Sequence, residues 1–321
     1  MTLSNRPRYA ARLNAFKVPG GNVAEMIAGA GRVGGLSAAD LNYPDHFADH
    51  TPAQLQRLLS DQGMALNGLA MRYYTDPGFR LGAFTHPDAA IRRKAIDLTK
   101  SGIDACAAMG GTQMTLWLGQ DGFDYSFQAD YARMWDDTLA AIAEVADHDP
   151  GIDIAVEYKP NEPRAFALMP DMATTLLALK DINRPNTGVT LDFAHVLYAG
   201  EMPAQAAQLA ARHSRILGVH LNDGYGKRDD GLMAGSVHPV QTVELFVELA
   251  GAGYDGVIYF DTFPDHSGLD PVQESQTNIR LTDRLRVIAA SLSANPALAE
   301  AQARQDAAAT TRIVMGALYG A

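Results

Sequence analysis

Cysteine is almost absent from this sequence, since its 321 residues include only Cys106. A single cysteine excludes an internal disulfide framework and is typical of a reducing compartment, so we expect a cytoplasmic protein. Long apolar runs are absent too, because no stretch approaches the ~20 apolar residues of a membrane-spanning helix. The opening residues, MTLSNRPRYAARLNAF, contain no apolar run long enough for a signal peptide. The sequence therefore predicts that the protein has no membrane partner.

Positive charge is also scarce, with 26 Lys and Arg against 37 Asp and Glu and a formal net charge of −11. An acidic protein repels the phosphate backbone, and no cluster of Lys and Arg marks a basic groove, so we expect no nucleic-acid partner. The Gly-rich fingerprint that follows the first strand of a dinucleotide-binding Rossmann fold is missing as well.

The chain does contain short apolar strands that alternate with longer helical segments from start to end. Strands are expected at residues 9–16, 35–41, 64–71, 112–116, from 154, 187–191, 216–221 and 256–260. Eight strand–helix pairs with nearly continuous apolar strands predict an α/β fold, a closed parallel (β/α)8 TIM barrel over residues 1–293. Residues 294–321 predict a short helical extension, with one helix at about 296–318 that packs on its own barrel or on a neighbouring subunit.

The stretch 154–164, IAVEYKPNEPR, carries much of the chemical information. Its apolar start predicts a buried strand, and Glu157 and Lys159 point to the same face because they are two residues apart. Two prolines then end the strand. A carboxylate beside an amine indicates either a site that holds a metal and polarises an oxygen, or a buried ion pair that closes the strand.

Active sites of such barrels form where the strands end. Strands five to eight each place one metal-type ligand there: Glu157, Asp192, His220 and Asp261. Taken singly, each has an ordinary explanation, since Asp192 can cap a turn and His220 can be a satisfied core histidine. Together, three carboxylates and one imidazole suit a divalent ion, for which we expect Mn²⁺, with Mg²⁺ or Co²⁺ as substitutes, and they do not resemble a thiolate zinc site.

A second set of polar residues lies beside the first. His195 follows Asp192 by three residues, and the loop after His220 contains Asp229 and Asp230. These side chains suit a second ion with Asp192 as a bridging ligand, and two such ions can hold vicinal substrate oxygens. The alternative is that the two aspartates belong to a solvated acidic loop.

These motifs resemble those of the xylose isomerase-like barrel superfamily. Residues 157–164, EYKPNEPR, are close to the EPKPNEPR signature of xylose isomerases, and L-rhamnose isomerases place similar residues at these strand ends. Residues 117–122, WLGQDG, resemble the family's Trp-Gly-Gly-Arg-Glu-Gly. Residues 229–232, DDGL, resemble its Asp-x-Asp-Leu element. The match covers most of the barrel.

The resemblance implies roles for individual residues. The implied first metal site is Glu157, Asp192, His220 and Asp261. The implied second site is Asp192, His195 and Asp229. The implied catalytic set is Lys159, Glu157 and His195, with Lys159 hydrogen-bonded to the substrate carbonyl oxygen. Trp117 is expected to wall the sugar pocket together with Phe263, and Asn42 or His46 lies near the position of a sugar-contacting histidine in the family.

The chain departs from the family pattern at three positions. Xylose isomerases have Glu at the position of Asp192 and Asp at that of His220, where rhamnose isomerases have His. The second aspartate of Asp-x-Asp falls on Gly231 here, with Asp230 displaced by one residue. That aspartate helps to activate water in the family, so its absence places the second ion and the usual hydride shift in question.

The resemblance implies a divalent-metal-dependent aldose–ketose isomerase that acts on a small sugar as a homodimer or homotetramer. A first rival is a ketose 3-epimerase, although Asp261 is one methylene shorter than the glutamate such enzymes use and Lys159 has no role in that chemistry. A lyase that acts on sugar acids or C-glycosides is a second rival, and a barrel kept only for binding is a third. Aromatic pocket walls are expected from Phe16, Tyr73, Phe84, Trp117 and Phe263. A phosphorylated substrate is left open by Lys227 and Arg228.

Overall fold

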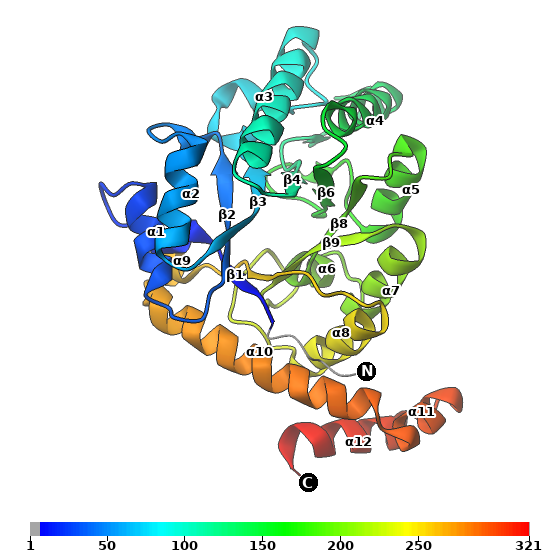
Figure 1. The fold of residues 1–321 in the computed structure, drawn as a ribbon. Helices are drawn as coiled ribbons and strands as arrows, with labels where there is room; N and C mark the ends of the chain where they lie inside the picture. The colour runs from blue at the N-terminus through cyan, green and yellow to red at the C-terminus, as the bar shows by residue number, and fades with distance from the viewer. Residues whose placement is uncertain (1–6, 321) are drawn as a thin grey trace.

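The computed structural model describes residues 7–320, and in it eight parallel strands form a nearly closed barrel surrounded by helices (Figure 1). The strands, in their order around the barrel, are β1 (Tyr9–Ala11), β10 (Ile258–Phe260), β9 (Ile216–Leu221), β8 (Thr187–Asp192), β6 (Asp153–Glu157), β4 (Gln113–Trp117), β3 (Ala65–Met71) and β2 (Ala38–Tyr43). Near the β1–β2 seam the backbone N–H of Ser37 donates to Tyr9 O over 3.0 Å. The predicted (β/α)8 barrel is therefore confirmed.

The helices that cover the barrel begin at well-formed caps. Asn22 and Thr51 each form a reciprocal capping box with the third helical residue of α1 and α2, which satisfies backbone donors that would otherwise lack partners. The barrel helices are α1 (Val23–Gly31), α2 (Pro52–Asp61), α3 (Ala89–Ala108), α4 (Tyr131–His148), α5 (Met172–Ile182), α6 (Phe193–Tyr198), α7 (Pro203–His213), α8 (Pro239–Gly251), α9 (Pro264–Ser267) and α10 (Pro271–Ser293). None of the helices within residues 7–320 combines the length and apolarity needed to cross a bilayer.

Short elements lie at the end of the barrel where the strands end. Four 3₁₀ helices are η1 (Leu13–Phe16), η2 (Asp45–Phe47), η3 (Tyr73–Thr75) and η4 (Pro77–Phe79). A small antiparallel sheet pairs β5 (Gly122–Phe123) with β7 (Phe166–Ala167). These elements belong to the loops after the strands, which is where the predicted site residues lie.

Two expected elements differ from the structure. The strand expected at 9–16 stops at Ala11, and residues Leu13–Phe16 form η1, which still buries Leu13 and Phe16 against the core without pairing to a neighbouring strand. The single helix expected at 296–318 is divided into α11 (Pro296–Ala303) and α12 (Ala307–Tyr319). The break follows from Gln305, which has φ 52°, and from Asp306, which caps the N-terminus of α12.

The core consists of the strands and the inward faces of the helices. All six residues of β8 are buried, as expected for a parallel strand covered on both sides. The extension formed by α11 and α12 lies outside the barrel, where α12 contacts α10 (Figure 1). No residue of α12 is fully buried, whereas α11 buries Leu298 and Ala301 and joins the core through Leu298.

Candidate active site

Four metal-type ligands converge where consecutive strands end. Glu157 is the last residue of β6, Asp192 the last of β8, His220 lies one residue before the end of β9, and Asp261 directly follows β10. Strand register brings them to one level, since Asp192 is paired with His220, which in turn is paired with Tyr259 two residues before Asp261. One ligand atom from each of the four residues lies within 4.8 Å of the others.

The imidazole of His220 lies at the centre of this cluster. Its Nδ1 is 3.1 Å from Glu157 Oε1, 3.9 Å from Asp261 Oδ2 and 4.0 Å from Asp192 Oδ2. Burial lowers the pKa of His220, but the surrounding carboxylates outweigh burial and raise that pKa to about 10. Burial also raises the pKa of Asp192 to about 7, against the opposing charge of His195. The cluster therefore holds more negative charge than its histidine neutralises.

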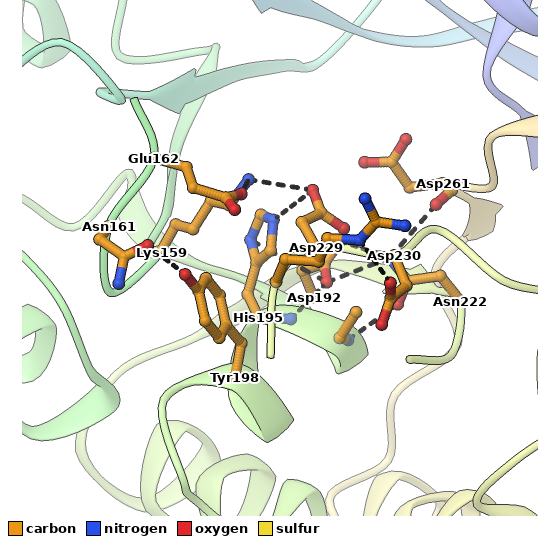
Figure 2. A network of polar contacts seen from close by, with 12 residues as sticks. Lys159, Asn161, Glu162, Asp192, His195, Tyr198, Asn222, Asp229, Asp230 and Asp261 are labelled. Atoms are coloured by element: carbon orange, nitrogen blue, oxygen red, sulfur yellow. Dashed lines mark hydrogen bonds and ion pairs between the residues drawn. The ribbon is translucent and has the colours of Figure 1, made fainter. Parts of the chain in front are cut away.

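Asp192 also caps the helix that follows it, as its position in the sequence suggested. Its Oδ1 accepts from the backbone N–H of His195 over 2.9 Å and so caps α6. Asn222 steadies the same carboxylate, because its Nδ2 lies 3.2 Å from both Asp192 oxygens and 3.2 Å from Asp261 O, while its Oδ1 accepts from Ala194 N (Figure 2). The carboxylate is thus oriented by neighbours, as metal ligands usually are.

Sequence reasoning did not assign Asn222 to the site. A signal was available, since Asn222 follows His220 by two residues along an extended segment and therefore points to the same face of the barrel. Asn222 is fully buried. It is a positioning residue for the ligand cluster.

The second predicted set surrounds Lys159 (Figure 2). Lys159 Nζ donates to Asp229 Oδ2 over 3.1 Å and forms an ion pair with Glu162 Oε2 at 2.9 Å, and His195 Nε2 lies 3.2 Å from the same Asp229 oxygen. Burial lowers the pKa of Lys159, but Asp229 and Glu162 outweigh burial, so the pKa is raised and the amine stays protonated at neutral pH. The turn that carries Glu162 is tied down by the hydroxyl of Tyr198, which donates to Asn161 Oδ1.

Only one of the two adjacent aspartates reaches this centre. Asp230 turns away, accepting from Tyr225 N and Arg228 Nε over 2.8 Å each. Gly231 has φ 57°, and a Cβ built there would lie 2.3 Å from the ring of Phe263. A second aspartate at position 231, as in the family element, is therefore incompatible with the position that Phe263 occupies.

The donor set fits a divalent ion. Three carboxylates and a histidine, mostly buried, are ligands that Mn²⁺ and Mg²⁺ accept. Two further buried atoms beside them, His195 Nδ1 and Asp229 Oδ1, have no hydrogen-bond partner among residues 7–320. Unpartnered buried polar atoms are costly, so they indicate that the site is completed by a group from outside the chain.

A cavity of about 370 Å³ opens over the ligand cluster, a size typical of small-molecule sites. The predicted residues Asn42, Trp117 and Phe263 line it together with Lys159. His46 does not line this cavity. It lies in a neighbouring one, where its Nδ1 accepts from Asn42 N over 3.0 Å and its Nε2 is 3.1 Å from Asn14 Oδ1.

The expected aromatic walls are partly wrong. Phe16, Tyr73 and Phe84 are buried in the hydrophobic core and do not line the cavity. Tyr74 takes the place expected for Tyr73, because η3 turns the chain after β3 so that Tyr73 points inward to Thr99, whose Oγ1 lies 2.6 Å from the Tyr73 hydroxyl. Tyr74 packs edge-to-face on Trp117, with ring centroids 5.1 Å apart.

Arginines also line the cavity, although the basic residues expected near a substrate were Lys227 and Arg228. Lys227 and Arg228 are exposed and do not line it. The arginines that line the cavity are Arg12, which follows β1, and Arg72, which follows β3. Arg12 is bound by Asp265, with its Nη1 2.7 Å from Asp265 Oδ1.

Comparison with known proteins gives consistent results. A family model described as "Xylose isomerase-like TIM barrel" matches residues 20–285. The xylose isomerases of Thermus thermophilus and Thermus caldophilus are each 28% identical to the chain over 226 residues, which cover 68% of the chain. The match covers 58% of the length of each of these relatives, so the chain spans less than two thirds of them.

Solved structures agree on the fold. An L-ribulose 3-epimerase superposes with a TM-score of 0.71 at 17% identity, covering 91% of this chain and 99% of that one. A xylose isomerase domain protein from Alicyclobacillus acidocaldarius gives 0.67 at 18% identity, with 88% and 99% covered. The D-allulose 3-epimerase of Methylomonas sp. gives 0.66 at 21% identity, with 88% and 99% covered.

Proposed function

The chain belongs to the xylose isomerase-like TIM barrel family, and from this premise we propose that it is a divalent-metal-dependent isomerase that interconverts an aldose and a ketose. The observation that carries the proposal is the position of Lys159. Its buried, protonated amine lies on a cavity that is also lined by three of the four converging ligands, Glu157, His220 and Asp261. A fixed cation beside a metal is what the migration of a hydride between neighbouring carbons requires, because negative charge develops on the two substrate oxygens.

In this proposal three groups of residues have separate roles in the reaction. Glu157, Asp192, His220 and Asp261 hold a divalent ion, which supplies Lewis-acid polarisation of the substrate oxygens when bound. Lys159 donates a hydrogen bond to the substrate carbonyl oxygen. His195, with Asp229 at 3.2 Å, is placed to hold or move the hydroxyl proton.

The cavity walls position the substrate and exclude water. Trp117 lies with its ring under the amine of Lys159, 5.4 Å from Nζ to the ring centroid. Phe263 lines the same cavity and packs against Gly231, and Asn42 offers an amide to sugar hydroxyls. We propose these three as substrate-contacting residues. For a second ion on Asp192, His195 and Asp229, the chain offers His195 Nδ1 and Asp229 Oδ1, while Asp229 Oδ2 keeps its contact with Lys159.

The test is a panel of aldoses and ketoses incubated with the purified protein after metal removal and reloading with Mn²⁺, Mg²⁺ or Co²⁺. The expected result is turnover only with metal, a product of unchanged mass, and transfer of deuterium from aldose C2 to C1 without loss to water. Conversion of a ketose to its C3 epimer without an aldose product would replace the isomerase with an epimerase. A product of changed mass would replace it with a lyase.

A further inference from the structure

Arg72 is the one cavity-lining arginine that the described chain leaves without a polar partner. Its Nε is fully buried and donates to no neighbour, and its guanidinium makes no hydrogen bond or ion pair with any residue from 7 to 320. The other cations of the cavity are engaged. Arg12 is held by Asp265, and Lys159 by Asp229 and Glu162. An unpaired cation in a partly buried position is unfavourable unless something outside the chain completes it.

The guanidinium is also held in a defined orientation. It lies over the ring of Tyr74, with Cζ 4.3 Å from the centroid, and Tyr74 is itself packed against Trp117 at 5.1 Å. This contact holds the guanidinium against an aromatic ring and leaves its two Nη groups free for two parallel hydrogen bonds. Carboxylate and phosphate are the groups that match this edge.

Arg72 lies where two cavities meet. It lines both the cavity over the ligand cluster and the neighbouring cavity of about 390 Å³ between η2 and α1. Lys17 is a second cation of that neighbouring cavity. Asp45 and Asp49 line it as well, and Asp45 is occupied by the hydroxyl of Thr75 at 3.0 Å. Arg72 therefore lies at the junction of the two cavities and is open to a sugar that extends from the ligand cluster toward the neighbouring cavity.

We infer that the substrate of this site is an acidic sugar, one that carries a carboxylate or phosphate at the end remote from its carbonyl, and that Arg72 binds this anionic group. The inference rests on the proposed isomerase function for the placement of the carbonyl end. The sequence leaves a phosphorylated substrate open because of Lys227 and Arg228. Neither of these residues lines the cavity, and Arg228 forms an ion pair with Asp230, so the anion is assigned to Arg72 instead.

The experiment measures binding and turnover for sugars matched except at one end. The Mn²⁺-loaded full chain is titrated calorimetrically with D-glucose, D-glucuronate and D-glucose 6-phosphate, and with D-ribose and D-ribose 5-phosphate, and kcat/KM is measured for the same compounds. The expected result is a preference of at least tenfold for an anionic sugar over its neutral counterpart. Comparison of D-glucuronate with D-glucose 6-phosphate identifies whether a carboxylate or a phosphate is preferred.

The variants test whether Arg72 causes the preference. Arg72→Met keeps the length and removes the charge, so the ratio of anionic to neutral affinity should fall by about 10- to 100-fold, the effect of losing hydrogen bonds to a charged group. Arg72→Lys should restore part of the ratio. Arg80→Met, on an exposed arginine of the same loop, should change neither value.

Each outcome bears on one hypothesis. If no anionic sugar binds wild-type protein more tightly than its neutral partner, or if Arg72→Met lowers both affinities in proportion, the inference is wrong, even where neutral sugars are isomerised. If anionic sugars bind in an Arg72-dependent manner but none is isomerised, the anionic site stands and the isomerase proposal fails.

Discussion

Lys159 Nζ and Asp229 Oδ2 lie 3.1 Å apart and join the end of β6 to the loop after β9. Both side chains are largely buried, with exposed fractions of 8% and 10%. His195 shares the same Asp229 oxygen, and Trp117 lies beneath the amine. The Asp229 carboxylate thus contacts both the amine proposed to polarise the carbonyl and the imidazole proposed to move the proton. The two chemical roles are therefore coupled through Asp229.

Replacing Lys159 by Met should reduce kcat about 10²- to 10³-fold, as loss of one preorganised donor to a developing oxyanion does. Metal content should stay within a factor of about two of wild type, because the amine is not a ligand. Metal analysis and steady-state kinetics on the same preparation check both statements. A Lys159→Met protein with full activity would remove the amine from the reaction.

Removing one charge from the ligand cluster should weaken metal binding and abolish turnover. Asp261→Asn and Glu157→Gln each keep the shape of the side chain but weaken an anionic ligand, so we expect at least a tenfold loss of metal affinity. Bound Mn²⁺ is measured by elemental analysis after dialysis, and circular dichroism checks the fold.

The matched control for this prediction is Asp255→Asn, the same chemical change on an exposed residue before the other end of β10. It should retain both metal and activity. Metal binding that survived both Asp261→Asn and Glu157→Gln would mean that the ion is held elsewhere.

Asp121, part of the WLGQDG motif, should prove important for stability. Its buried carboxylate accepts from Ala83 N, Thr85 N and Thr85 Oγ1 at 2.7–3.2 Å, which anchors the long loop before α3. Asp121→Ala leaves those donors unpaired and should lower the free energy of unfolding by about 1–3 kcal/mol, measured by urea denaturation. Asp136→Ala, at an exposed position, should have less than half that effect.

The barrel and its four-ligand cluster could be predicted because both depend on periodic, local signals. Apolar strands spaced by helices define the barrel, and a parallel barrel gathers all strand ends at one face. Glu157, Asp192, His220 and Asp261 were therefore expected together, and the structure brings them within 4.8 Å. The EYKPNEPR segment placed Lys159 beside them for the same reason.

Not all residues that line the cavity from loops could be predicted in this way. The choice of Tyr74 over Tyr73 as a cavity wall depends on the 3₁₀ turn after β3, which has no strong period in the sequence. Asp229 and Asp230 are adjacent in the sequence, and only their tertiary contacts distinguish them, since Asp229 contacts Lys159 and His195 whereas Asp230 accepts from Tyr225 N and Arg228 Nε. Arg72 became notable only because the folded chain gives it no partner.

Acid should destabilise the protein partly through His46. This buried imidazole accepts from Asn42 N at Nδ1, so protonation at that atom would break a hydrogen bond. Burial lowers the pKa of His46 to about 4, with Arg72 and Lys17 adding repulsion. Because the folded pKa lies below the unfolded value of about 6.5, the neutral ring stabilises the fold above pH 6.5, and that contribution is lost as the pH falls toward 4.

Between pH 6.5 and pH 4, the protonation of His46 lowers the free energy of unfolding by about 3 kcal/mol at most. The measurement compares the free energy of unfolding from urea denaturation at pH 6.5 and pH 4 for wild type and His46→Gln. His46→Gln should be less stable at pH 6.5 but should lose less between the two pH values, because glutamine does not titrate. His213→Gln, at an exposed histidine at the end of α7, should follow the wild-type profile. Parallel profiles for wild type and His46→Gln would show that His46 does not carry this part of the acid sensitivity, and the loss would then belong to carboxylates whose pKa the fold lowers, such as Asp229.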